Sequence, residues 1–330
     1  MKKLVIILVI LTLTFALVAC KRIDQALDNE DDSSPVTEGA VPDVVEATSP
    51  DAVTLLDAPE TTTPAFMFNL ENIPLIDGST ATIPLIEAVY SVLLGVPRDQ
   101  AAQMVSTSGT DSAYDNLIWG DAGILLVYSP SPHVLENAKN NGIELEMAPI
   151  GRDGLVFLVN NVNPVKSLTP EEIVSIYSGE ITNWKAAGGE DVEIKAFQRP
   201  DRSGSQTMMD ELVMKGIPMA QTEAEYVIGE MGGLIDAVAL YDNAQSAIGY
   251  NVYYFVSKME INENVRMLAV GGVEPSTESI SDGSYPLVSD FYAVIKKDTP
   301  PDSPARILYD WIQSADGQNL IKHEGYATAG

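Results

Sequence analysis

Residues 154–177 read GLVFLVNNVNPVKSLTPEEIVSIY, and this stretch decides the fold class. Its first six residues form a continuous apolar run, which is typical of a buried strand. Thr169 then supplies a helix N-cap, Pro170 stands at the first helical position, and Glu172 completes a capping box. Because apolar residues follow at helical spacing, the stretch predicts a buried strand and then an amphipathic helix.

The same alternation continues on the N-terminal side of this stretch. Residues 83–93 carry apolar side chains at helical spacing, and Gly95 ends that helix. Residues 122–128 are a second apolar run, and residues 132–141 form a helix that Gly142 closes. Strands that alternate with helices in this way predict an α/β protein with mostly parallel sheets over residues 65–330.

Composition limits the kinds of partner. The chain has 330 residues, of which 47 are Asp or Glu and 19 are Lys or Arg, so its net charge is −28. The length suits about two domains. Affinity for nucleic acid or for anionic lipid comes from clustered Lys and Arg, and no such cluster interrupts the acidity. We therefore expect no nucleic-acid partner.

The N-terminus has the features of a secretion signal. Lys2 and Lys3 precede an apolar stretch, residues 4–18, that stops at Ala19 and Cys20. This pattern resembles the lipobox of bacterial lipoproteins, in which Cys20 would be lipidated after residues 1–19 are removed. It implies palmitate on Cys20 and a position on the extracytoplasmic face of the cell membrane. The alternative is a retained anchor helix, since the stretch is only slightly short for a span.

Residues 20–64 differ in character from the rest of the chain. Between residues 21 and 63, eleven Asp and Glu stand against Lys21 and Arg22, without a sustained apolar period. Such a segment cannot bury enough apolar surface to offset its chain entropy. We predict that it is an acidic disordered tether. Cys20 is the only Cys, so the chain can form no intramolecular disulfide.

No pattern in the sequence calls for catalysis. The chain lacks the HExxH, Walker and GxSxG motifs, and its two His residues, His133 and His323, have no evident partner. We therefore predict no catalytic residue, no metal site and no cofactor. An extracellular hydrolase acting on phosphate esters is the alternative that would require such groups.

Three turns rich in Ser, Thr and Gly each precede a predicted helix, at residues 78–81, 107–110 and 203–205. Helix N-termini present free backbone N–H groups and a favourable dipole to an anion. Ser and Thr also cap helices without binding any ligand, which is the simpler interpretation of each single turn. Arg199 lies four residues before the third turn and can bind an oxyanion bidentately, which favours an oxyanion site.

Residues 199–205, RPDRSGS, resemble the R-x-x-x-S-G-[ST] phosphate loop of the PstS family, the phosphate-binding proteins of high-affinity ABC importers. Residues 176–184, IYSGEITNW, are similar to that family's I-Y-x-G-x-I-x-N-W stretch. Residues 247–250 and the closing Gly325 and Tyr326 are also similar. The resemblance covers about residues 77–326, nearly the whole predicted body.

This resemblance implies a two-lobed, type II periplasmic-binding-protein fold, with a small oxyanion, most simply phosphate, held in the cleft between the lobes. Arg199 would pair with the charge of the oxyanion. Trp184 and Tyr177 are better interpreted as core residues. The other implied donors are hydroxyl and backbone N–H groups of Thr80, Ala81, Thr107 or Ser108, Ser203, Gly204 and Ser205.

The sequence departs from the family at one position. Relatives commonly place an Asp after the strand that corresponds to residues 122–128, where it accepts a hydrogen bond from protonated phosphate. Here Ser129 and Pro130 follow Tyr128. Either another carboxylate fills the role, or discrimination is weaker, or the ligand is a different oxyanion such as sulfate or molybdate.

We predict that residues 65–153 and 256–330 form lobe one and residues 154–255 form lobe two. The family implies a monomer that delivers its ligand to a membrane permease and its ATPase after the lobes close. A sensory or scaffolding lipoprotein of the same fold is the alternative from another class of function.

Overall fold

The computed structural model describes residues 66–328, which belong to one compact unit of the chain, Pro59–Gly330. The predicted signal peptide (residues 1–19), Cys20 and the predicted tether (residues 20–64) lie outside the described residues. Within residues 66–328, no helix combines the length and the apolar character that crossing a bilayer requires.

Seven strands form one mixed sheet in the order β1-β2-β9-β3-β6-β5, with β7 paired to β3. β4 and β8 form a separate two-stranded sheet. The strands are β1 Ile76–Gly78, β2 Ile124–Tyr128, β3 Leu145–Asn160, β4 Ser167–Leu168, β5 Lys195–Ala196, β6 Ala247–Val252, β7 Val265–Met267, β8 Ala269–Val270 and β9 Val288–Lys296.

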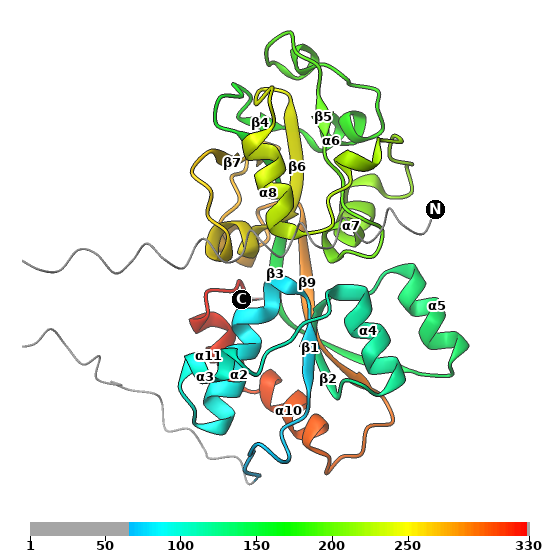
Figure 1. The fold of residues 1–330 in the computed structure, drawn as a ribbon, viewed down its shortest axis with the longest axis vertical. Helices are drawn as coiled ribbons and strands as arrows, with labels where there is room; N and C mark the ends of the chain where they lie inside the picture. The colour runs from blue at the N-terminus through cyan, green and yellow to red at the C-terminus, as the bar shows by residue number, and fades with distance from the viewer. Residues whose placement is uncertain (1–65, 329–330) are drawn as a thin grey trace, which may run out of the picture. The chain divides into compact units, whose positions relative to one another are not determined.

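Helices cover this sheet and connect its strands (Figure 1). The α-helices are α2 Ile83–Leu94, α3 Arg98–Ala102, α4 Thr110–Trp119, α5 Pro132–Asn140, α6 Pro170–Tyr177, α7 Gly204–Met208, α8 Met231–Leu240, α9 Thr277–Ser281, α10 Pro304–Gln313 and α11 Ala315–His323. Shorter 3₁₀ and π segments are η1 Thr80–Thr82, η2 Trp184–Ala187, η3 Met209–Met214, η4 Ala224–Tyr226 and η5 Phe255–Met259.

The long strand β3 joins two lobes. Up to Gly154 it pairs with β9, and from Leu155 onward it pairs with β6 and β7. Lobe one contains β1, β2 and β9, and lobe two contains β5, β6 and β7, with β3 running through both (Figure 1). The two-lobed α/β fold that the sequence predicted is confirmed.

The prediction of mostly parallel sheets is wrong. Among the strands of residues 66–328, only β1–β2, β5–β6 and β4–β8 are parallel pairs, whereas β3 is antiparallel to β6, β7 and β9, and β2 is antiparallel to β9. The reason is that β3 passes through both lobes, so the strands that return beside it run in the opposite direction. Apolar runs do not reveal strand direction.

The local signals around Thr169 are confirmed. Its side chain accepts a hydrogen bond from the backbone N–H of Glu172, and the Glu172 carboxylate accepts one from the Thr169 N–H. Trp184 and Tyr177 are buried in the core, as predicted. Gly95 ends α2 in the left-handed conformation, with φ of 64°, which glycine adopts without a Cβ clash.

The lobe boundaries stay a prediction, with one shift. β7 pairs with Leu158–Asn160 of β3, in lobe two, and β8 pairs with β4. Both strands lie after Val256, the predicted start of the second segment of lobe one. Pairing with β9 places residues from Val288 onward in lobe one, so we propose that the second crossing lies after Val270.

A buried carboxylate stands where β3 changes partners. Asp153, only 1% exposed, accepts hydrogen bonds from the hydroxyl of Tyr128 at 2.6 Å, from the N–H of Gly154 at 2.8 Å and from the N–H of Tyr254 at 3.1 Å. Burial raises the pKa of this carboxyl to about 6, although these donors oppose the increase. Asp153 therefore connects the crossing of β3 and the backbone of Tyr254 to the end of β2.

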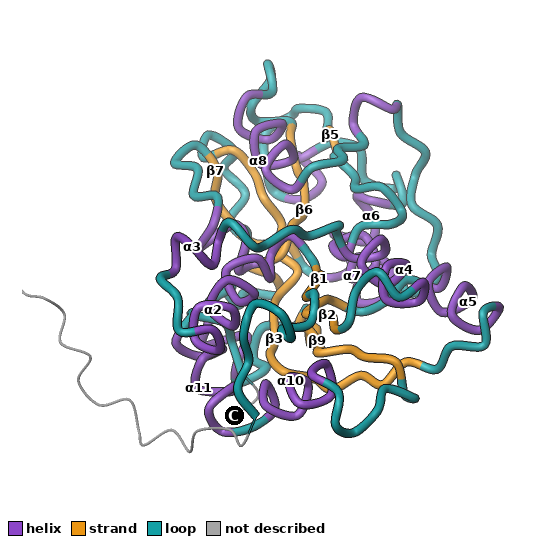
Figure 2. Tube along the Cα trace, turned by 60° about the horizontal axis from the view of Figure 1, so that its bottom comes forward, coloured by secondary structure: helices purple, strands orange, loops and turns teal. Residues whose placement is uncertain are grey.

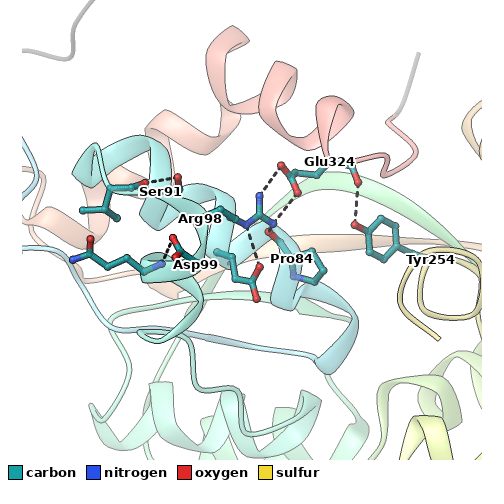
Figure 3. Close-up of polar contacts among 9 residues, drawn as sticks. Pro84, Ser91, Arg98, Asp99, Tyr254 and Glu324 are labelled. Carbon is teal, nitrogen blue, oxygen red and sulfur yellow. Dashed lines mark hydrogen bonds and ion pairs between the residues drawn. The ribbon is translucent and has the colours of Figure 1, made fainter. Parts of the chain in front are cut away.

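Arg98 ties the helices of lobe one to the same junction (Figure 3). Its guanidinium forms two hydrogen bonds of 2.9 Å with the Glu324 carboxylate after α11 and one of 3.0 Å with Glu87 of α2. The backbone carbonyl of Glu324 accepts a hydrogen bond of 2.9 Å from the Tyr254 hydroxyl. α2 and α11 are thus held together beside Tyr254, whose N–H also donates to Asp153.

Asp153 should make stability depend on pH in an unusual direction. Its folded pKa of about 6 lies above the unfolded value of about 3.9, so its contribution to stability is full below pH 4 and is lost as the pH rises through 6. The stability of Asp153→Asn should therefore increase relative to wild type by about 2 kcal/mol between pH 4 and pH 7. Urea unfolding at both pH values measures the difference, and a difference that stays constant with pH would contradict this account.

Candidate functional site

A cavity of about 330 Å³ lies between the two lobes. Loops at the starts of η1 and α4 supply its lobe-one wall, and the loop before α7 and the segment before α8 supply its lobe-two wall. α4 and α7 lie side by side there (Figure 2). The lining residues are Ser79, Thr80, Thr107–Thr110, Ser112, Tyr128, Arg199, Pro200, Arg202–Ser205, Gly229–Met231 and Val252.

The cavity brings together residues from all three predicted turns. Ala81 is the one predicted residue that does not line the cavity, because it is fully buried in the lobe-one core. The predicted residues that line it are Thr80, Thr107, Ser108, Arg199, Ser203, Gly204 and Ser205.

Arg199 is a buried cation without an acidic partner. It is 6% exposed, and its guanidinium donates to the backbone carbonyl of Ile228 at 2.9 Å and to the hydroxyl of Ser205 at 3.3 Å. No carboxylate of residues 66–328 forms an ion pair with it. Burial lowers the pKa of Arg199, but a guanidinium stays charged in proteins. The described residues therefore give this positive charge no ion pair, although the Glu230 carboxylate of the same cavity favours its charged form.

Buried hydrogen bonds fix the lobe-one turns. The hydroxyls of Ser79 and Thr110 lie 2.8 Å apart, which joins the first turn to the start of α4. Asp77, 3% exposed, accepts a hydrogen bond of 2.8 Å from the Ser108 N–H and one of 2.8 Å from the Asn116 amide. That amide also donates to the Ser108 hydroxyl. The polar groups of this wall are thus held in position by α4.

The lobe-two turn is equally constrained. Ser203 caps α7 by accepting a hydrogen bond of 3.2 Å from the Gln206 N–H. The Tyr250 hydroxyl accepts a hydrogen bond of 2.9 Å from the Arg199 N–H and donates to the Gln206 side chain. A β-carbon on Gly204 would lie 2.5 Å from the Thr110 hydroxyl, so glycine lets the two lobes approach at this point.

The lining residues with polar or large side chains that the sequence did not predict as ligand contacts include Ser112, Tyr128, Arg202, Glu230 and Met231. Tyr128 ends β2, and its hydroxyl donates to Asp153. Glu230 is the carboxylate among the lining residues, and it comes from lobe two, directly before α8. No local sequence signal predicts this role for Glu230, because the segment before α8 reaches the cavity only once the chain is folded.

Three comparisons place the chain among known proteins. The model of the PBP superfamily domain matches residues 72–315. Phosphate-binding protein PstS of Bacillus subtilis is 25% identical over 255 residues, which cover 76% of this chain and 79% of that protein. PstS of Borreliella burgdorferi is 25% identical over 179 residues, 53% of this chain, and this match spans less than two thirds of that protein, 62% of its length.

A crystal structure from Clostridium perfringens, assigned as a phosphate ABC transporter substrate-binding protein with bound phosphate, is similar in fold. Its TM-score is 0.58 at 27% identity, and the match covers 78% of this chain and all of that chain. The superfamily model spans most of the present sequence and both lobes that flank the cavity. This chain therefore belongs to the PBP superfamily.

Proposed function

We propose that this chain is the substrate-binding protein of an ABC importer and that it captures inorganic phosphate between its lobes. The observation that carries the proposal is the buried guanidinium of Arg199, which lines the interlobe cavity and forms no ion pair with residues 66–328. A buried charge is costly unless it is paired, so this arrangement favours an anion as the missing partner.

The remaining groups of the cavity suit a tetrahedral oxyanion. Thr80, Thr107 and Ser108 line the cavity from lobe one, and Ser203 and Ser205 line it from lobe two. Such donors, together with backbone N–H groups at helix starts, bind phosphate oxygens in proteins. Because the two sets lie on different lobes, a small anion must contact both, and its binding would favour the closed form.

Glu230 bears on the choice of oxyanion. An ionised carboxylate accepts a hydrogen bond from a protonated phosphate oxygen but repels sulfate, which carries no proton at neutral pH. Its place in the cavity wall supports phosphate and offers a substitute for the Asp that is absent after β2. The relatives named phosphate-binding protein PstS support the same ligand.

The transport role and the location are further parts of the proposal. The relative from Clostridium perfringens is assigned to a phosphate ABC transporter, which supports a membrane permease and its ATPase as partners. The lipobox-like sequence that ends at Cys20 supports a lipid anchor on the extracytoplasmic face of the membrane. The proposed protein is a monomer that binds and releases its ligand without chemical change.

Arg199→Gln should remove the positive charge while keeping a polar side chain. The loss of a charge-paired hydrogen bond in a closed cleft costs about 2–5 kcal/mol, or about thirtyfold to several thousandfold in affinity. Calorimetric titration with phosphate, sulfate, arsenate and molybdate measures the effect. Arg152→Gln is the matched control, since Arg152 pairs with Asp290 outside the cavity. If Arg199→Gln binds phosphate like wild type, the site is elsewhere.

Gly204→Ala should keep the lobes apart, because the new methyl group would meet the Thr110 hydroxyl at 2.5 Å. Dyes on Lys139→Cys of lobe one and Gln221→Cys of lobe two, in a full-length chain carrying Cys20→Ser, report the interlobe distance by energy transfer. The variant should lose the high-transfer population and bind phosphate at least about tenfold more weakly. Gly232→Ala is the control, because Gly232 does not line the cavity and the nearest atom to a β-carbon there would be a Glu260 carboxylate oxygen at 3.8 Å. Equal effects of the two changes would refute the steric explanation.

Cys20→Ala should abolish lipid attachment, because the thiol is the group that is acylated in a lipobox. Labelled palmitate should be incorporated into the wild-type chain and not into the variant. The variant should be released from the membrane or remain unprocessed. Equal labelling of the two proteins would rule out Cys20 as the anchor.

A further inference from the structure

Two arginines line the cavity, and they differ in their charge partners. Arg199 has no carboxylate partner in the described part of the chain, whereas Arg202 has two. A terminal nitrogen of Arg202 forms an ion pair with Asp115, and its Nε lies 3.8 Å from Oδ2 of Asp111. Arg202 belongs to the lobe-two loop before α7, and both carboxylates belong to α4 of lobe one. The ion pairs therefore cross the cleft at its edge.

The two carboxylates are held in place by lobe one itself. The Asp111 side chain is fully buried, and its Oδ2 accepts a hydrogen bond of 2.6 Å from the Ser131 hydroxyl. Oδ1 of Asp111 has no hydrogen-bond partner among residues 66–328. Asp115, with a side chain 10% exposed, accepts a hydrogen bond of 2.7 Å from the Asn137 amide. Lobe one thus presents two fixed acceptors whose cationic partner comes from lobe two.

The position of this pair relates it directly to closure. Thr110 and Ser112, which flank Asp111 on α4, line the cavity, and so do Ser203 and Gly204, which follow Arg202. The same two segments also meet where Gly204 faces Thr110. An ion pair here can form only when the ligand-binding turns of the two lobes are side by side.

We propose that Arg202 is a positioning residue for ligand capture, because its ion pairs with Asp111 and Asp115 hold the two lobes in the closed arrangement. Arg202 does not supply charge to the ligand, since two carboxylates already compensate it. Its link to capture rests on the function proposed above, whereas its effect on closure does not.

A direct role in anion binding makes the opposite prediction for one variant. If Arg202 bound the oxyanion itself, Asp115→Asn would free the guanidinium, and affinity for phosphate would stay the same or increase. If Arg202 holds the lobes together, Asp115→Asn removes one partner of the pair, and affinity should fall as it does in Arg202→Gln. Apparent affinity scales with the fraction of molecules in the competent state.

Closure is measured first, without ligand, by energy transfer between the dyes on Lys139→Cys and Gln221→Cys. Arg202→Gln and Asp115→Asn should both lower the high-transfer fraction, although they change the net charge in opposite directions, so general charge repulsion cannot explain both. Arg202→Lys should restore part of that fraction, and Lys297→Gln should leave it unchanged, because Lys297 pairs with Glu144 within lobe one. Unchanged closure in Arg202→Gln would overturn the proposal.

Phosphate binding is measured second, by calorimetry and by the rate of phosphate release. Arg202→Gln and Asp115→Asn should each weaken binding by about tenfold, mainly through faster release, and the double variant should be no weaker than either alone. Wild-type affinity in Asp115→Asn would assign Arg202 to the ligand instead. Absence of phosphate binding by wild type, with the expected changes in closure, would reject the proposed ligand and retain the interlobe role of Arg202.

Discussion

The buried charge of Arg199 is the constraint on which the rest of the site depends. A guanidinium that is 6% exposed and forms no ion pair within the described part of the chain is stable only if the surrounding groups, or a bound anion, replace water. The Ile228 carbonyl and the Ser205 hydroxyl supply only part of that replacement. The net charge of −28 does not oppose an anion here, because exposed charges beyond about 10 Å are largely screened at physiological salt.

The sheet explains how two lobes can share one ligand. β3 passes from its pairing with β9 to its pairing with β6 at Gly154 and Leu155, so the interlobe connection is continuous strand. Asp153 lies at this point and binds the hydroxyl of Tyr128, which also lines the cavity. Through this contact the wall of the site and the junction between the lobes share one buried carboxylate.

The sequence was informative where the signal is local. The capping box at Thr169 and the glycine after α2 depend on residues a few positions apart, and both are present. Arg199 and the three turns could be proposed because helix starts and a family motif mark them, and the fold brings these residues to one cavity. Their role as ligands stays a prediction.

What the sequence could not reveal depends on contacts between distant segments. The antiparallel partners of β3 come from the C-terminal half of the chain, and no apolar run specifies direction. Arg202 and Asp115 are 87 residues apart, and each looks like an ordinary surface charge in the sequence. Likewise, no sequence signal separates Glu230 and Asp153 from the other acidic residues, of which the chain has 47 in total. The contacts that set these four residues apart from other charged residues form only when the lobes are folded and packed.

A crystal structure of the chain grown with phosphate tests the central claim most directly. The account predicts one oxyanion between the lobes, in contact with the Arg199 guanidinium and with hydroxyl or N–H donors from both the 107–110 and the 203–205 turns. An oxyanion bound elsewhere, or a cavity left without one while Arg199 pairs with a carboxylate, would contradict it.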